Sequence, residues 1–170
     1  MHRKKHIWCA VMIFLIAAFD QITKYFAVKN LKGSEPVDFI KGFIRFNYAE
    51  NTGMAFSLFG GARWIFVAVT AVACAAALWY IFSNCCKSLW LYWSIAVIAA
   101  GGIGNLIDRA LYGYVVDFIE PVFVDFAVFN IADCAVTLGA ISLVAYLVVD
   151  LFKSDKDNQK KPEKGDNPCE

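Results

Sequence analysis

Four stretches of the chain are apolar over about 20 residues each, and polar segments separate them. They cover residues 7–26, 64–82, 89–107 and 131–151. A helix of about 20 residues crosses the roughly 30 Å hydrocarbon core of a bilayer. The pattern therefore predicts an all-α membrane protein with four transmembrane helices. Trp and Tyr residues flank the short turn at 83–88, as is typical of side chains at a membrane interface.

The composition agrees with a location in a membrane. Hydrophobic residues make up 59% of the 170 residues and charged residues only 18%, and the aromatics are 15 Phe, 7 Tyr and 5 Trp. A soluble domain is typically about 25% charged, and a soluble chain of this length has too small an interior to bury so many apolar side chains. The net charge of +1 gives no basic face for a nucleic acid, so we expect no nucleic-acid partner.

An even number of transmembrane helices places both termini on the same side of the membrane. With the termini inside, nine Lys and Arg residues lie inside and seven outside, so the positive-inside rule favours cytoplasmic termini. The two long loops, 27–63 and 108–130, then face outward, and neither contains a cysteine. We interpret residues 1–152 as one integral-membrane domain, and the polar residues 153–170 as a disordered cytoplasmic tail.

This topology gathers the polar residues that border the membrane at one face. The two long loops must lie on the same side, together with the helix ends next to them. The residues expected there are Asp20, Lys24, Asn51, Asn105, Asp108, Arg109, Asp117, Asn130 and Asp133. An acidic residue costs roughly 2.5–3.5 kcal/mol at the centre of a transmembrane helix, so its default interpretation is functional. A function is therefore expected on the side of the long loops.

Asp117 and Asp133 are the strongest candidates for chemistry, because each lies among apolar neighbours at the predicted membrane boundary. Two aspartates held close together share a proton, so one can activate water while the other polarises a scissile carbonyl. Simpler roles are also open at this point. Asp133 can interact with the dipole of a helix that begins beside it, and Asp117 can be an ordinary loop acid. Asp20 and Lys24, four residues apart, can simply neutralise one another.

The rest of the sequence limits the other chemistries. Both histidines, His2 and His6, lie in the N-terminal segment on the face opposite the acids, so they cannot complete a nucleophilic triad or a His-based metal site there. Two further sites have no supporting motif: a Ser–Lys pair of Lys24 with Ser57 or Ser34, and a carboxylate site for magnesium or calcium built from Asp117, Glu120, Asp125 and Asp133. We expect no metal and no cofactor.

Two classes of protein that are not enzymes are also compatible with these observations. One is a small proton- or ion-coupled transporter that uses Asp20, Asp108 and Asp133. Such a protein would place acids near the middle of its helices and show an internal repeat, and the sequence shows neither. The other is an assembly subunit of a membrane complex, whose polar residues would be spread over both faces.

Five short motifs occur in order between Phe19 and Gly139. They are Asp20-Gln21-Ile22-Thr23-Lys24, Asn51-Thr52-Gly53-Met54-Ala55-Phe56, Gly101-Gly102-Ile103-Gly104-Asn105-Leu106-Ile107-Asp108-Arg109, Gly113-Tyr114-Val115-Val116-Asp117-Phe118 and Phe129-Asn130-Ile131-Ala132-Asp133. Together, on four apolar helices of the right length, they resemble the lipoprotein signal peptidases, also called signal peptidase II. Met54 stands where that family more often has a small residue.

The resemblance implies a membrane-embedded aspartic endopeptidase without a cofactor. Its substrates would be diacylglyceryl-modified prolipoproteins, cleaved just before the lipidated cysteine. By match to the motifs, Asp117 and Asp133 would be catalytic, and the residues that shape or support the site would be Asp20, Lys24, Asn51, Gly53, Asn105, Arg109 and Asn130. The resemblance also implies a monomeric enzyme of the bacterial inner membrane, in contact with membrane lipids, with its active site near the extracytoplasmic face.

The resemblance also suggests a use for the first long loop. Residues 37–48 are rich in Phe and Ile around a turn candidate at Lys41-Gly42 and predict short strands, and residues 114–119 are strand-like as well. Residues 51–61 are expected to form an apolar flap or short helix on the membrane surface. In the family such parts form a small extracytoplasmic cradle and a clamp for the substrate.

Overall fold

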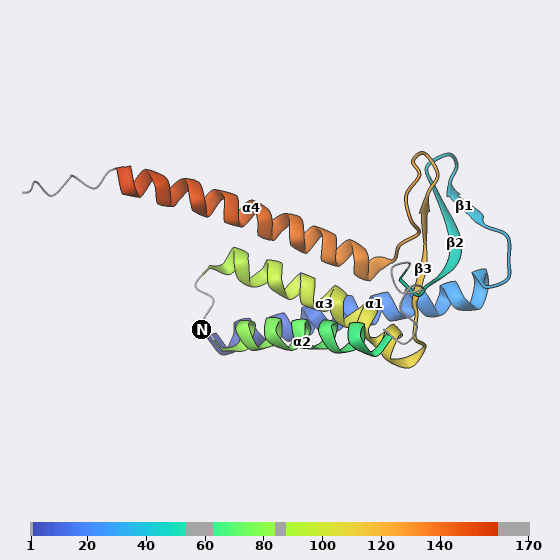
Figure 1. Ribbon diagram of the computed structural model, residues 1–170, viewed down its shortest axis with the longest axis horizontal. Helices are drawn as coiled ribbons and strands as arrows, with labels where there is room; N and C mark the ends of the chain where they lie inside the picture. The colour runs from blue at the N-terminus through green and yellow to red at the C-terminus, as the bar shows by residue number, and fades with distance from the viewer. Residues whose placement is uncertain (1, 54–62, 84–87, 160–170) are drawn as a thin grey trace, which may run out of the picture.

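The computed structural model describes residues 2–53, 63–83 and 88–159. In these residues the chain forms long helices with a small sheet at one end (Figure 1). The helices are α1 (His2–Leu31), α2 (Arg63–Phe82), α3 (Leu89–Leu111) and α4 (Ile131–Gln159). The strands are β1 (Val37–Ile40), β2 (Ile44–Asn51) and β3 (Val115–Pro121). The strands run across the direction of the helices (Figure 1).

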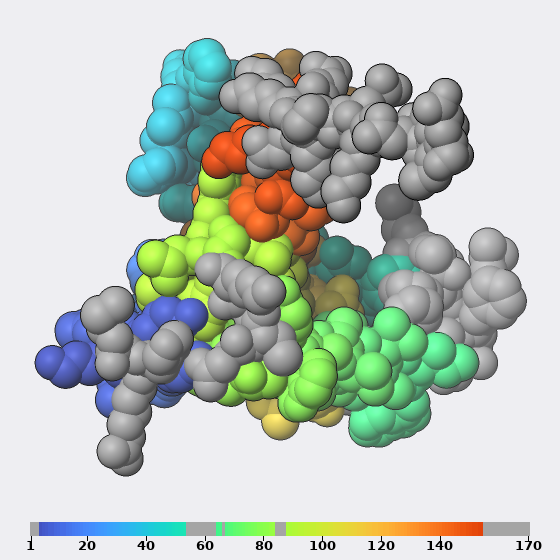
Figure 2. All heavy atoms as spheres, turned by 90° about the vertical axis from the view of Figure 1, so that its left-hand side faces the viewer, coloured from blue at the N-terminus to red at the C-terminus, as the bar shows by residue number. Residues whose placement is uncertain are grey.

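The helix α3 lies at the centre of the bundle and contacts α1, α2 and α4. Figure 2 looks along the bundle and shows α3 in yellow-green between α4 in orange, α2 in green and α1 in blue. Small side chains permit this close packing. Ala96, Ala99 and Ala100 are buried in α3, and a Cβ added at Gly139 of α4 would lie 2.6 Å from the side chain of Ile98.

Three helices are long and apolar enough to cross a membrane: Lys4–Leu31, Leu89–Leu111 and Ile131–Ser154. In α2 the apolar part described is shorter and covers Val67–Phe82. Three of the four predicted transmembrane segments are thus supported by length and composition, and the segment at 64–82 stays a prediction. Large apolar side chains such as Phe14, Leu138 and Leu151 are more than 60% exposed on the helices, as suits side chains that face lipid.

The predicted strands are confirmed. The sheet is antiparallel in the order β1-β2-β3. Gly42 has a φ of +77° in the turn between β1 and β2, a conformation that glycine adopts without strain. The sheet packs on the C-terminal part of α1, where Ala27, Val116 and Phe118 form a small buried cluster. This packing fixes β3 beside the ends of α1 and α3.

Three helices extend several residues beyond the predicted boundaries, and α3 does so by continuing to Leu111. The first helix begins before residue 7 and continues to Leu31. The last helix continues to Gln159, so residues 153–159 of the segment predicted to be disordered are helical. Residues 160–170 lie outside the described part of the chain, as do Met54 and all of the predicted flap except residues 51–53.

Candidate active site

The helix α4 begins at the site, and its first turn fixes one of the two candidate aspartates. Asn130 precedes the helix, and its Oδ1 accepts a hydrogen bond of 2.9 Å from the backbone N–H of Asp133. In return, Asp133 Oδ2 accepts a bond of 3.3 Å from the backbone N–H of Asn130. This reciprocal arrangement is a capping box, which satisfies backbone donors that a helix start leaves open. It also fixes the position of the Asp133 carboxylate.

The strand β3 holds the other aspartate in the interior. Asp117 is 1% exposed and lies opposite Ala49 of β2. Its Oδ2 accepts a hydrogen bond of 2.8 Å from Asn51 Nδ2, and its Oδ1 one of 2.6 Å from Asn130 Nδ2. Burial raises the pKa of Asp117 to about 6, and these two hydrogen bonds oppose the rise while the charge of Asp133 adds to it. The Asp117 carboxyl is therefore more readily protonated than an exposed aspartate.

Asn105 of α3 connects the two halves of the site. Its Nδ2 donates a hydrogen bond of 2.7 Å to Asp133 Oδ1, and its Oδ1 accepts one of 3.1 Å from Asn130 Nδ2. The two asparagines thus form a bridge from Asp117 to Asp133. Because both carboxylates accept bonds from this one pair of side chains, the bridge holds them close to one another.

Below this bridge, Lys24 lies in a buried ion cluster. Its Nζ lies 2.8 Å from Asp20 Oδ2, 2.9 Å from Asp108 Oδ2 and 2.9 Å from Asn105 Oδ1. Asp20, Lys24 and Asp108 are all at most 3% exposed. Gln21 Nε2 donates a further bond of 2.9 Å to Asp108 Oδ1. The predicted pair of Asp20 and Lys24 is confirmed as part of this larger cluster.

The cluster also supports the helix start and the third strand. Asp20 Oδ1 accepts a hydrogen bond of 2.8 Å from the backbone N–H of Ala132 in α4. Asp108 Oδ2 accepts one of 3.1 Å from the backbone N–H of Val116 in β3. A Cβ added at Gly104 would lie 2.6 Å from Asp20 Oδ2, so only glycine leaves room for this carboxylate. Asp20 therefore connects α4, which carries Asp133, to the helix bundle, and Asp108 connects β3 in the same way.

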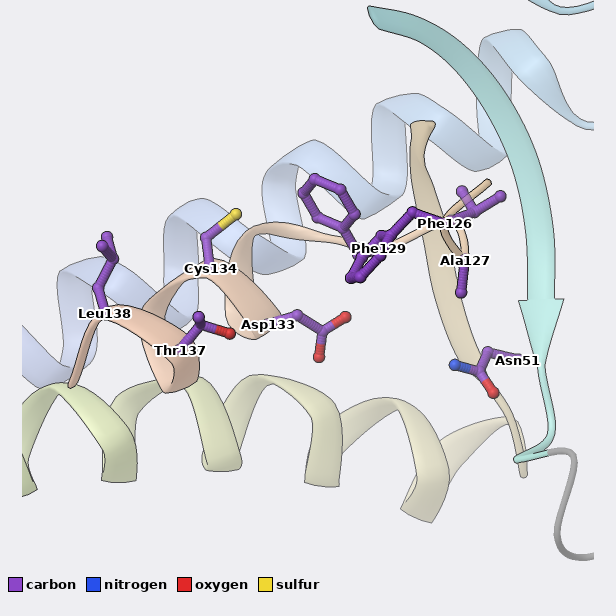
Figure 3. Close-up of a pocket in the computed structure, with 9 residues that line it drawn as sticks. Asn51, Phe126, Ala127, Phe129, Asp133, Cys134, Thr137 and Leu138 are labelled. Carbon is purple, nitrogen blue, oxygen red and sulfur yellow. The ribbon is translucent and has the colours of Figure 1, made fainter. Parts of the chain in front are cut away.

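A groove of about 540 Å³ opens beside Asp133. One wall is the apolar segment from Phe126 to Phe129, and the other is the face of α4 that carries Cys134, Thr137 and Leu138. Figure 3 shows the side chain of Asp133 pointing toward Asn51, which lies at one end of this groove. An extended apolar ligand in the groove would therefore lie against the Asp133 carboxylate.

The structure brings together most residues that the sequence placed at one face. Eight of them interact directly through the bonds given above: Asp20, Lys24, Asn51, Asn105, Asp108, Asp117, Asn130 and Asp133. Gly53 joins them through its backbone N–H, which donates a bond of 2.8 Å to Asn51 Oδ1, and its φ is +77°. Arg109 lies half-buried on the last turn of α3, directly after Asp108.

Two supporting residues were not among the predicted site residues. Asp108 and Gln21 both stand inside motifs, and Asp108 follows Asn105 by one helical turn, which was the available signal. Of the open alternatives, the carboxylate site loses one ligand, because Glu120 is bound by Arg45 Nε at 2.7 Å. Lys24 is already held by three acceptors, so it is not placed as the base of a Ser–Lys pair. Within residues 2–53, 63–83 and 88–159, no group of three or more His, Cys, Asp or Glu forms a metal site.

Comparison of this chain with known proteins identifies its family. The family model described as signal peptidase (SPase) II matches residues 12–149. The chain belongs to the signal peptidase II family. A lipoprotein signal peptidase of Streptococcus thermophilus is 40% identical over 137 residues, which cover 81% of this chain and 90% of that protein. A lipoprotein signal peptidase of Streptococcus pyogenes serotype M6 is 38% identical over 144 residues, covering 85% and 94%.

Solved structures agree with this family assignment. One bacterial membrane enzyme, determined by the in meso method at 1.9 Å resolution, matches with a TM-score of 0.76 and 30% identity over 82% of this chain and 91% of that chain. A second, at 2.3 Å resolution, matches with a TM-score of 0.74 and 28% identity over 92% and 93%. The protein is therefore a bacterial membrane protein of a peptidase family, which decides against the transporter and the assembly subunit.

Proposed function

We propose that the protein removes the signal peptide from prolipoproteins that carry a diacylglyceryl group on cysteine, with Asp117 and Asp133 as an aspartic dyad. The observation that carries the proposal is the asparagine bridge, which holds two carboxyl groups from different elements together at the end of an apolar groove. The named activity of the streptococcal relatives supports the substrate class.

The reaction needs one ionised and one protonated aspartate. The ionised carboxylate takes a proton from water while the water oxygen attacks the scissile carbonyl carbon, and the protonated carboxyl gives its proton to the carbonyl oxygen. The tetrahedral intermediate then collapses. The C–N bond breaks, the leaving nitrogen takes the proton held by the first aspartate, and a hydroxyl of the intermediate returns a proton to the second. Both aspartates are thereby restored.

The groove is the proposed binding site for the substrate, and the protein has a defined orientation in the membrane. The apolar walls from Phe126 to Phe129 and along α4 receive the signal segment and its lipid at the membrane boundary. The termini are cytoplasmic, α2 is the fourth transmembrane segment, and the site faces the extracytoplasmic side. Residues 1–152 form the single peptidase domain, and the enzyme acts as a monomer without metal or cofactor. Asn51, Gly53 and Arg109 border the dyad as supporting residues.

The test is to change Asp117→Asn and Asp133→Asn separately and to measure cleavage of a diacylglyceryl-modified prolipoprotein in proteoliposomes. Each variant should lose at least about 10²-fold in rate, because each removes one partner of the general acid–base pair. Asp38→Asn is the matched control, since Asp38 is an exposed acid of β1 and should retain the wild-type rate. Full processing by either dyad variant would contradict the proposal.

A further inference from the structure

The buried ammonium of Lys24 has three hydrogen-bond acceptors, and one of them leads toward the dyad. Asp20 and Asp108 accept two of its bonds, and Asn105 Oδ1 accepts the third at 2.9 Å. Two carboxylates already exceed the charge of one ammonium, so the bond to a neutral amide is not needed to balance charge. The third bond therefore serves to connect the ion cluster with Asn105.

Asn105 transmits this contact to Asp133. Its carbonyl oxygen accepts the bond from Lys24, and its Nδ2 donates to Asp133 Oδ1 at 2.7 Å, within the range of charge-assisted bonds. A cation bound to an amide oxygen withdraws electrons from the amide, which makes its N–H a stronger donor. The chain from Lys24 through Asn105 thus stabilises negative charge on Asp133. The capping box adds the positive end of the α4 dipole to the same carboxylate.

Asp117 lies in a different environment. Its two hydrogen bonds come from Asn51 and Asn130, and neither of these amides binds a charged donor through its oxygen. Lys24 affects the pKa of Asp117 only through space and lowers it slightly, whereas burial has the largest effect and raises it. The charged residues joined to the pair through hydrogen bonds and ion pairs are Asp20 and Lys24 of α1 and Asp108 of α3.

From this asymmetry we infer that Lys24, acting through Asn105, is a positioning group that makes Asp133 the ionised member of the dyad and leaves Asp117 as the proton carrier. The inference rests on the proposed function and adds an assignment of roles to it. Asp133 then takes the proton from water, and Asp117 gives its proton to the scissile carbonyl. The assignment also fits exposure, since Asp133 is half-buried at the open groove and Asp117 is buried behind it.

The test is the pH dependence of cleavage by an Asn105→Ala variant in proteoliposomes. Loss of the donor makes the ionised Asp133 harder to form, so the rising acid limb of kcat/KM should move to higher pH by about one unit. KM for the prolipoprotein should change little, because Asn105 lies behind the dyad and not on the groove wall. Asn105→Ser is the second variant, since it keeps a polar side chain but lacks the amide that connects Lys24 to Asp133.

The matched control is Gln21→Ala. Gln21 donates to Asp108 Oδ1 in the same ion cluster but has no bond to Asn105. If the cluster were merely structural, Gln21→Ala and the Asn105 variants would alter thermal stability alone and leave the profile in place. An acid limb that superimposes on that of the wild type in the folded Asn105 variants would overturn the inference. If the acid limb is unchanged but both Asp117→Asn and Asp133→Asn abolish cleavage, the assignment of roles is wrong and the proposed function is still supported.

Discussion

The side-chain amides of Asn105 and Asn130 are hydrogen-bonded to each other at 3.1 Å, and each also donates to one of the two aspartates. Asn105 comes from α3, and Asn130 precedes α4. The relative position of the two carboxyl groups is therefore set by the packing of these helices. Both amides are buried, with Asn130 at 0% exposure, so replacing either leaves hydrogen-bonding groups without partners.

The first prediction separates the two tasks of Asn130, which caps α4 and bridges the dyad. Asn130→Ser keeps a good capping residue but is too short to donate to Asp117, whereas Asn130→Ala loses both functions. We expect both variants to lose about 10-fold or more in kcat. The Ser variant should be more stable than the Ala variant by about 1 kcal/mol in thermal unfolding in detergent. A Ser variant with the wild-type kcat would show that the bridge is not needed.

The second prediction concerns pH and stability. Burial raises the pKa of Asp117 from its ordinary value of 3.8 to about 6. The folded state therefore binds more protons than the unfolded state between these pH values, and Asp117 destabilises the fold as pH rises through about 6. Asp117→Asn should thus be more stable than the wild type at pH 7.5, by at most about 3 kcal/mol.

This stability gain has a specific pH signature. The difference in unfolding midpoint between Asp117→Asn and the wild type should shrink as the pH falls from 7.5 to 4. At pH 4 the side chain at position 117 is neutral in both folded proteins. Asp38→Asn, on the exposed strand β1, should show no such trend. A difference that is the same at all these pH values would contradict the raised pKa of Asp117.

The third prediction uses the close approach of α3 to Asp20. Gly104→Ala places a Cβ 2.6 Å from Asp20 Oδ2, so the carboxylate must move away from Lys24 and from the N–H of Ala132. We expect a loss of about 2 kcal/mol or more in stability, because buried partners are separated. Gly102→Ala is the control on the same helix, where the nearest atom is Cys74 Sγ, the end of a side chain that can rotate. Equal losses in both variants would contradict a specific role for Gly104.

The fourth prediction concerns metals. We expect cleavage in proteoliposomes to continue unchanged after treatment with EDTA, because the proposed reaction uses only two carboxyl groups and water. Glu120→Gln should also retain activity, since Glu120 is engaged with Arg45 and Asn47 on the sheet. Loss of activity that magnesium restores would revive the carboxylate–metal site.

The fifth prediction concerns topology. A reporter fused after Phe152 should be located in the cytoplasm, and one inserted at Glu35, in the segment between α1 and β1, should be located outside. This result requires an odd number of membrane crossings between the two points. It requires α2 to cross along with α3 and α4, although only Val67–Phe82 of α2 is described as apolar helix. Both reporters on one side would contradict the predicted fourth span.

The sequence by itself determined the helices and the face on which the polar residues gather. Apolar stretches of about 20 residues specify helices long enough to cross a bilayer, and their order predicts that both long loops lie on one side. Strand positions followed from local composition around Lys41-Gly42 and from the apolar run that contains Asp117. The motifs identified the family because their residue types are specific when they occur together, and they singled out the two aspartates as candidates. The sequence did not show where α4 ends, because Lys and Asp residues after Phe152 are compatible with both a helix and a disordered tail.

Only the tertiary structure decided which polar residue contacts which. Asp20 lies 112 positions before Ala132, yet its carboxylate accepts the bond from the N–H of Ala132, and no local pattern encodes a pairing over that distance. The same holds for Asp108, whose bonds to Gln21, Lys24 and Val116 depend on the close packing that Gly104 permits. Hydrogen bonds between helices require both backbones to be in place first. The difference in environment between Asp117 and Asp133 is therefore a property of the fold and could not be obtained from their spacing.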